Sequence, residues 1–197
     1  MDLINEDKNQ TRKEEREKRR LKILSAALDI FIQKGYAVTK INDIAFAVDM
    51  NNESVMHYFE SKEKIYEELI RIGKKGFPSI IKNNEAEPLQ FFEALAGEMF
   101  RYIEKYPFFA KMFVFLPQVY TNNAASDTVK ELLSEGEENQ FIYEKLKQGQ
   151  LNGKIKEGDA TALLNAFFGA INGIAMYTAL ANSPLPDSKW VVDIIRK

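Results

Sequence analysis

Apolar residues recur at helical spacing in the first part of the chain. The first pattern stops at Gly35, a residue that readily adopts the left-handed conformation just past a helix, and it comprises Leu21, Leu24, Ala27, Leu28 and Phe31. A second pattern over residues 41–48 follows Thr39, whose hydroxyl we expect to cap the helix start. These patterns predict two helices joined by a turn that contains glycine.

Two further helices are predicted directly afterwards. Asp49 interrupts the pattern, Asn51 is a suitable cap, and Val55 and Phe59 lie on one face of a short third helix. Ser61 then precedes a fourth helix. A short turn between the second and third helices is typical of a helix-turn-helix, whose last helix can lie in a DNA major groove. An ordinary three-helix corner gives the same periodicity, so the pattern alone leaves both interpretations open.

Helical patterns continue to the end of the chain. Prolines and capping residues predict helices over residues 88–106, 107–116, 126 to about 149, 159–181 and 187–197. The 159–181 segment is almost uniformly apolar, so we expect it to be buried on nearly all sides. No segment alternates in the manner of a strand, so the predicted class is all-α with about nine helices.

Composition removes several classes of function. The chain has 197 residues and is 45% hydrophobic, which suits one or two compact domains. Cysteine is absent and His57 is the single histidine, so disulfides, thiolate nucleophiles and histidine-rich metal sites are ruled out. No glycine-rich phosphate loop or metal-binding acidic pair stands out. We therefore predict that the protein is not an enzyme and has no catalytic residues, no metal and no cofactor.

The pattern also bears on location. The longest apolar runs are about ten residues, roughly half of what a membrane crossing requires. The N-terminal stretch MDLINEDKNQ is polar and acidic, unlike a secretory signal. We expect a cytoplasmic protein that does not span a membrane.

Charge is unevenly distributed, although the net charge of −2 gives no global sign of a nucleic-acid partner. The segment 8–22 holds three glutamates and eight basic residues, which are Lys8, Arg12, Lys13, Arg16, Lys18, Arg19, Arg20 and Lys22. A solvated helix with pairs such as Glu14 to Lys18 is one interpretation. Attraction to DNA phosphates is the alternative.

Residues 16–66 resemble the DNA-binding domain of the tetracycline-repressor (TetR) family of transcriptional regulators. The stretch ILSAALDIFIQKGYAVTKINDIA (23–45) is similar to the family's first helix, glycine turn and second helix. The stretch HYFESKEKIY (57–66) is similar to the family's aromatic pair and the Ser-Lys-Glu that follows it. The resemblance implies a helix-turn-helix DNA-binding domain with a basic N-terminal arm over 1–66. It also implies a helical ligand-binding and dimerisation domain over 67–197.

The chain departs from the family pattern at the DNA-facing helix. Asp49 stands where glycine is usual, and aspartate visits the left-handed conformation more easily than most residues. Glu53 stands where a small residue is common, and it either supports the helix start or accepts from a cytosine amino group. Met56 stands where a tyrosine normally reaches a phosphate, and its thioether cannot donate a hydrogen bond. We expect one phosphate contact to be lost.

The resemblance implies DNA contacts from the starts of the second and fourth helices and from the third helix. The candidates are Thr39, Lys40, Asn51, Asn52, Glu53, Met56, His57, Tyr58 and Lys62. Asn52 can make a bidentate contact to adenine, with solvated surface as the alternative. Tyr58 alternatively packs its ring on the first helix. The basic arm would compensate for Met56 by general attraction to phosphate or by entering the minor groove.

Helices 88–106 and 107–116 are dense in aromatic residues and methionines. Most of these must be core, yet soft side chains between helices also line apolar pockets. The resemblance implies an inducer site in this domain, for which the candidates are Met99, Tyr102, Phe109, Phe113, Phe168 and Asn172. We expect an apolar or amphipathic ligand.

A stripe of small and amide side chains runs along the 159–181 helix. It comprises Asn165, Gly169, Asn172 and Met176, with Gly173 beside it, and small residues let another helix approach closely. The resembling family dimerises through a four-helix bundle of its last two helices. The resemblance therefore implies a homodimer seam made by this stripe and by the apolar residues of 187–197. A stripe that faces the ligand pocket is the alternative.

The leading functional prediction is a homodimeric, ligand-responsive transcriptional repressor that binds a double-stranded DNA operator. The alternative is a regulatory or adaptor module on the same fold whose sequence-specific DNA binding is degenerate, as Glu53 and Met56 suggest.

Overall fold

The computed structural model describes residues 2–81, 86–122, 126–134 and 138–197, and it describes side chains over 11–75, 86–122, 126–133 and 140–197. Ten helices and one isolated bridge make up the regular structure of these residues, which confirms the all-α class. The chain divides into two compact units, Met1–Ile70 and Arg71–Lys197. Each unit is described by itself.

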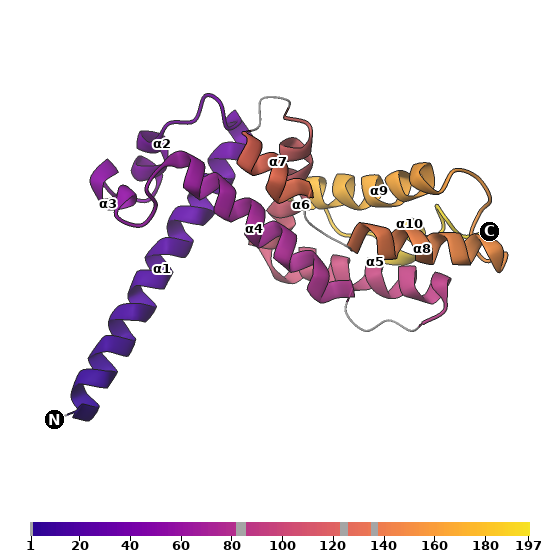
Figure 1. Cartoon of the computed structure of the whole chain (residues 1–197), viewed down its shortest axis with the longest axis horizontal. Coiled ribbons are helices and arrows are strands. Elements are labelled where there is room, and N and C mark those ends of the chain that lie inside the picture. The colour runs from indigo at the N-terminus through magenta and orange to yellow at the C-terminus, as the bar shows by residue number, and fades with distance from the viewer. Residues whose placement is uncertain (1, 82–85, 123–125, 135–137) are drawn as a thin grey trace. The chain divides into compact units, whose positions relative to one another are not determined.

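The first unit contains α1 (Asp2–Lys34), α2 (Ile41–Ala47), α3 (Asn52–Met56) and the start of α4 (Lys62–Ile81) (Figure 1). The predicted apolar faces meet in a core whose fully buried members include Leu24, Leu28, Phe31, Ile44, Val55, Ile65 and Leu69. Helix α1 ends as predicted, because Gly35 has a φ of 83° and its N–H donates to the carbonyl of Phe31 at 2.9 Å.

The predicted cap at Thr39 is wrong. Helix α2 begins at Ile41 with Lys40 at the N-cap position, and the Asp43 carboxylate accepts from the Lys40 N–H at 2.9 Å. The Thr39 side chain is buried and its hydroxyl donates to the Gly35 carbonyl at 2.7 Å. The hydroxyl is therefore used to close the turn after α1, where an unsatisfied helix carbonyl competes for it.

The second unit contains the rest of α4, then α5 (Pro88–Lys105), α6 (Pro107–Tyr120), α7 (Asp127–Ser134), α8 (Glu138–Leu151), α9 (Ala160–Ala181) and α10 (Ser188–Val192). Helix α6 continues through Pro117 instead of ending at 116. The single helix predicted from Ser126 is two helices, α7 and α8, with residues 135–137 outside the described part of the chain. The core of this unit is built on aromatic pairs such as Phe92 and Phe167, whose ring centroids lie 5.3 Å apart.

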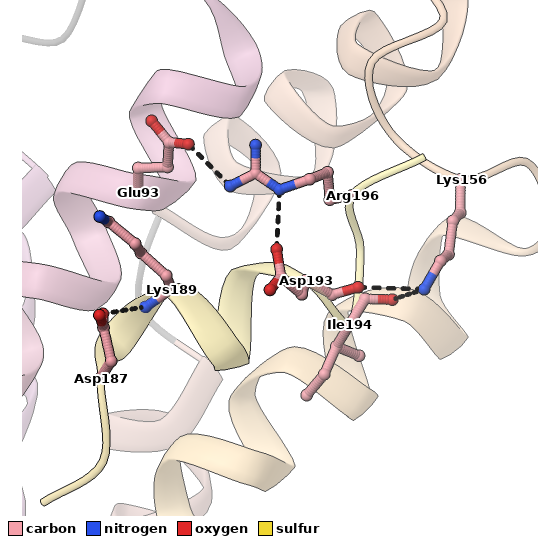
Figure 2. Close-up of polar contacts among 7 residues, drawn as sticks. All are labelled: Glu93, Lys156, Asp187, Lys189, Asp193, Ile194 and Arg196. Atoms are coloured by element: carbon pink, nitrogen blue, oxygen red, sulfur yellow. Dashed lines mark hydrogen bonds and ion pairs between the residues drawn. The ribbon is translucent and has the colours of Figure 1, made fainter.

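The C-terminal segment is shorter as a helix than the sequence predicted. After α10 the backbone turns to pair with the loop before α9, since the Lys156 N–H donates to the Ile195 carbonyl at 2.8 Å. Figure 2 shows the Lys156 ammonium reaching the carbonyls of Asp193 and Ile194, at 3.1 and 2.8 Å. The Arg196 guanidinium lies between Asp193 and Glu93 of α5, at 2.8 and 2.9 Å (Figure 2). These contacts hold the end of the chain against the core of its own unit.

Helix α9 is buried on one face only, so the prediction of burial on nearly all sides is wrong. Its fully covered residues are Ala160, Phe167, Ile171 and Ala175, and it packs mainly against α6. Among the described residues, α9 is also the one helix whose length and composition would allow it to cross a membrane. The same properties are found in helices that a protein partner covers, so composition alone does not separate the two.

Candidate nucleic-acid interface

The turn between α2 and α3 is tight and held from several sides. Asp49 has a φ of 58°, which is the left-handed conformation that aspartate adopts more easily than most residues. The Met50 N–H donates to the Ala45 carbonyl at 2.9 Å. From α1, the Lys22 ammonium donates to the Val48 carbonyl at 3.1 Å. The start of α3 is thereby fixed relative to both preceding helices.

Helix α3 has one buried and one exposed face. The Asn51 side chain accepts from the Ser54 N–H at 2.8 Å, which confirms Asn51 as the N-cap. Val55 and, just past the helix, Phe59 are buried. The exposed side chains are Asn52, Glu53, Met56 and His57, while Tyr58 is half-buried. The short helix therefore presents the predicted base-reading and phosphate-facing positions to solvent.

A groove of about 390 Å³ lies where the starts of α2 and α4 meet the end of α3. Four of the predicted DNA-contacting residues line it, namely Thr39, Lys40, Met56 and Lys62. The other lining residues, which were not predicted from the sequence, are Ile41, Glu60, Ser61 and Glu63. Their positions at two helix starts are the signal that could have found them, because helix N-terminal amides favour anions.

Lys62 is partly committed to the fold. Its ammonium donates to the carbonyls of Tyr36 and Thr39, at 2.9 and 2.8 Å, and lies 4.2 Å from the centre of the Tyr36 ring. An ammonium has three hydrogens, so one remains for a phosphate. Lys62 thus ties the loop before α2 to the start of α4, in addition to its predicted role on DNA. Because the Thr39 hydroxyl points inward, only the backbone of Thr39 can bind a phosphate.

A tyrosine–glutamate pair also joins the loop before α2 to the start of α4. The Tyr36 hydroxyl donates to the Glu63 carboxylate at 2.9 Å. Burial and then this hydrogen bond raise the pKa of Tyr36 well above its usual value. The Ser61 hydroxyl, followed by the backbone and Tyr36, holds the pKa of Glu63 below its usual value. Glu63 is therefore an anion at neutral pH and stands at the rim of the groove.

The groove is not basic overall. It holds two cations, Lys40 and Lys62, and two carboxylates, Glu60 and Glu63, so its formal charges cancel. Glu53 adds an exposed negative charge on α3. Attraction to a phosphate backbone must therefore come from helix starts at the groove and from positive charge elsewhere in the unit.

The predicted basic arm is helical in the described residues. It forms the N-terminal part of α1, which runs clear of α2 and α3 in Figure 1, and residues 11–19 are all exposed. A helix with side chains is about 10–12 Å wide, whereas the minor groove of B-DNA is about 6 Å wide. The helical conformation therefore favours contact with phosphates over entry into the minor groove.

The six predicted ligand residues all belong to the second unit. Met99 and Phe113 are buried in the core, and Phe168 packs against it. Tyr102 and Phe109 contact each other with ring centroids 5.9 Å apart. A groove of about 350 Å³ beside α5 and residues 185–188 is lined by none of the six. The ligand site stays a prediction.

The predicted stripe on α9 lies on the outer face of its unit. Asn165, Gly169 and Met176 are exposed and Asn172 is half-buried. A Cβ atom placed on Gly169 or Gly173 would meet nothing within 4 Å. Within the unit, the stripe therefore faces away from the core.

The apolar residues of 187–197 behave differently from the stripe. Val191 and Ile195 are buried in the core of their own unit, where α10 packs on α5. The part of the predicted seam that used them is wrong, because residues of the same chain already cover both side chains. Among the apolar residues of 187–197, Trp190 is exposed.

Comparison with known proteins identifies relatives of both units. Residues 23–69 match the family model of bacterial regulatory proteins, tetR family. The chain is 24% identical over 166 residues to the HTH-type transcriptional regulator QacR of Staphylococcus aureus (strain Mu50 / ATCC 700699), a match that covers 80% of this chain and 84% of that protein.

A second relative is the biofilm operon icaADBC HTH-type negative transcriptional regulator IcaR of Staphylococcus aureus (strain Newman). It is 32% identical over 82 residues, which is 42% of this chain and 44% of that protein. Among solved structures, AibR in complex with isovaleryl coenzyme A and operator DNA superposes with a TM-score of 0.66 and 16% identity. The match covers 89% of this chain and 94% of that one, and it shows a shared fold. The matched family and relatives are regulators rather than enzymes, as the sequence predicted.

Proposed function

Since this chain belongs to the TetR family of transcriptional regulators, we propose that it is a repressor that binds operator DNA as a homodimer and is released or engaged by a small apolar or amphipathic molecule. The observation that carries the proposal is the capped helix α3, which is held in the core on one side by Val55 and Phe59. Its other side exposes Asn52, Glu53, Met56 and His57. A helix so presented fits a DNA major groove. We expect the protein in the cytoplasm, where DNA is accessible.

Contacts to DNA divide into two groups in this proposal. Asn52 and Glu53, at the exposed start of α3, read base edges through an amide and a carboxylate. Lys40, His57, Tyr58 and the third hydrogen of Lys62 bind phosphate, while Met56 contacts a sugar or a thymine methyl group. The backbone amides at the groove of α2 and α4 support these phosphate contacts.

Dimerisation occurs through the outer face of α9 in this proposal. The support is chemical: the face exposes Met176, Tyr177 and Leu180, at 39%, 61% and 53% of their full accessible area. Exposed apolar surface of this extent is typical of a protein interface. The open positions at Gly169 and Gly173 leave room for close approach of a partner helix.

The proposed ligand is defined by its class, an apolar or amphipathic small molecule. Aromatic residues of α5, α6 and α9, together with Met99, belong to the second unit's core, and such side chains adapt to apolar ligands. A fold neighbour, AibR, was solved with isovaleryl coenzyme A and operator DNA together. We propose that this chain likewise binds both operator DNA and a small molecule, with a ligand of its own.

The test is recovery of genomic fragments by the full-length protein, followed by sequencing. We expect a small set of enriched sites with two similar half-sites about one helical turn apart, because a two-fold dimer places two α3 helices on one face of DNA. Gel shifts on an enriched site and on a random duplex, over a range of salt, then give the specificity ratio. Equal affinity for both duplexes would favour the adaptor alternative with degenerate sequence reading.

A further inference from the structure

The basic residues of the α1 extension occupy one side of the helix. An α-helix turns by about 100° per residue, so Arg12, Lys13, Arg16, Arg19 and Arg20 all lie within about 60° of the direction of Arg16. Glu14, Glu15 and Glu17 lie about 100° or more from it by the same count. We call the set Arg12, Lys13, Arg16 and Arg19 the basic stripe. Lys18, about 160° from Arg16, lies on the opposite side.

The basic stripe continues the buried face of α1. Beyond it, Ile23 and Ala27 are fully buried and point within about 20° of the same direction. Arg20 marks the transition: its guanidinium contacts Glu68 of α4 at 2.6 Å and lies 5.1 Å from the centre of the Phe59 ring. Phe59 follows α3 by three residues. The stripe therefore leaves the folded part of the unit next to the α3–α4 junction, on the side toward which α1 packs.

The stripe has charge and no apolar surface. Residues 11–20, TRKEEREKRR, contain no apolar side chain, and residues 11–19 are exposed. An amphipathic membrane helix needs an apolar face, and a helix docked on protein needs one as well. No ion pair links the four stripe residues to another side chain within the described part of the chain. What remains is a partner that offers closely spaced negative charge.

We propose that the basic stripe binds the phosphates of the same DNA duplex that α3 engages. The stripe would do so as a rigid helical extension beside the recognition helix α3. The inference rests on the proposed DNA-binding function and adds to it a separate, sequence-independent contact. Arg12 and Arg19 are about 10 Å apart along the helix axis, and duplex DNA carries one negative charge per about 1.7 Å. The stripe also supplies the positive charge that the electrically balanced groove between α2 and α4 lacks.

The test compares substitutions on the two sides of one helix. Arg16→Gln and Lys18→Gln each remove one charge, two residues apart, and glutamine keeps the helix propensity of both residues. A triple variant, Arg12→Gln/Arg16→Gln/Arg19→Gln, removes most of the stripe. Full-length proteins are titrated with a random-sequence duplex and with a fragment enriched from the genome, at several salt concentrations. Circular dichroism and thermal melting check that all variants stay folded.

We expect the triple variant to lower the slope of log K against log salt by about 2.7 per bound protomer, and so by about 5.4 for a dimer, since each phosphate contact contributes about 0.9. The change should be the same on both duplexes. Affinity at 0.1 M salt should fall roughly 100-fold or more, and Arg16→Gln should weaken binding several-fold more than Lys18→Gln. The ratio of operator to random affinity should stay constant, because the stripe reads no bases.

Two outcomes would overturn the proposal in distinguishable ways. If the wild-type protein binds DNA but the triple variant keeps its slope, or if Arg16→Gln and Lys18→Gln have equal effects, the stripe does not contact phosphate while DNA binding by α3 stands. If the wild-type protein binds neither duplex at low salt, the proposed DNA-binding function fails and the stripe fails with it.

Discussion

The two units each expose a helix face that their own residues leave uncovered, and the two faces have opposite chemistry. On α1, residues 11–19 are exposed and every side chain is polar or charged. On α9, the exposed face carries Met176, Tyr177 and Leu180 among small residues and amides. A charged helix is stable in water and suits a polyanion, whereas an apolar face requires another protein surface. The difference indicates two kinds of partner for one chain.

The units also differ in how they hold their surfaces in place. In the first unit, side chains fix loops by donating to backbone carbonyls, as Lys22, Thr39 and Lys62 do. In the second unit, aromatic rings packed edge to face, such as Phe91, Phe92 and Phe167, form the core. A short recognition helix has little apolar area of its own, so polar contacts to the backbone must set its position.

The largest expected effect comes from breaking the apolar face. Gly169→Leu should weaken the dimer by about 2–6 kcal/mol, because a bulky side chain strains a close crossing by roughly 1–3 kcal/mol and occurs twice in a symmetric pair. The protomer itself should stay stable, since Gly169 has open space around its Cβ position. Operator binding should be lost with no DNA contact changed, because half-sites are read only by two linked α3 helices. Sedimentation and gel shifts measure both.

Gly97→Leu is the matched control for this substitution. Gly97 is also a helical glycine, on α5, and a Cβ atom placed on it would meet nothing within 4 Å. Leucine there should change neither the dimer nor DNA binding. If Gly169→Leu leaves a stable dimer with normal operator affinity, the seam lies on another face and the contrast between α1 and α9 is wrong.

The second-largest effect is expected on operator affinity, from a polar residue of α3. Asn52→Ala should cost about 1–3 kcal/mol on the best operator and little on random DNA, because an amide that pairs with a base edge carries sequence information. Asn52 is exposed, so alanine should leave the fold intact, and thermal melting checks this. Equal losses on operator and random duplex would assign Asn52 to the DNA backbone.

A third prediction separates folding from binding within the groove. Lys62→Met should lower the free energy of unfolding by about 1–3 kcal/mol, since two carbonyls lose a charged donor while the apolar stem is kept. It should also lower the salt slope for DNA by about one unit per bound protomer, and so by about two units for the dimer. Lys40→Met, on an exposed lysine of the same groove, should lower the slope by a similar amount and leave melting unchanged. An unchanged slope for Lys62→Met would make Lys62 a purely structural residue.

The smallest effect is a pH dependence of the first unit. The pKa of Tyr36 is raised in the folded protein, so above about pH 10 the unfolded chain releases a proton that the folded chain retains. The stability from this hydroxyl is therefore complete below about pH 10 and is lost as the pH rises further. Tyr36→Phe should cost up to about 1 kcal/mol at neutral pH, with a difference from wild type that shrinks at alkaline pH. Denaturant titrations at about pH 7 and about pH 10.5 measure this change, and a constant difference would show that neither burial nor the Glu63 contact raises the pKa of Tyr36.

Much of the local structure could be predicted from residue patterns. The end of α1 at Gly35, the cap at Asn51 and the left-handed Asp49 follow from the conformational preferences of single residues. The predicted family is confirmed by the match over residues 23–69. The DNA-contacting and ligand-binding residues stay predictions, because the structure fixes where they lie and not what they bind.

Other features could not be predicted because a competing hydrogen-bond partner decides them. Thr39 was expected at a helix start, but the carbonyl of Gly35 accepts its hydroxyl. The 187–197 segment has the apolar spacing of a helix. From Asp193 onward, however, its backbone hydrogen-bonds to Lys156 and the loop before α9 instead of continuing the helix. In both cases an alternative hydrogen-bond partner outweighs a local preference of about 1 kcal/mol, and only for the C-terminal segment is that partner far away in the sequence.

The sequence by itself determined the helical class, the family and the placement of charge along α1, because these depend on periodicity and residue type within a few turns of helix. Only the tertiary structure decided which side of each helix is covered. It turned Val191 and Ile195 into the core, left the stripe of α9 outside, and set the basic residues of α1 in line with the face that packs against Phe59 and Glu68. Burial is a property of the whole packing arrangement, and periodicity shows only that a helix has two sides.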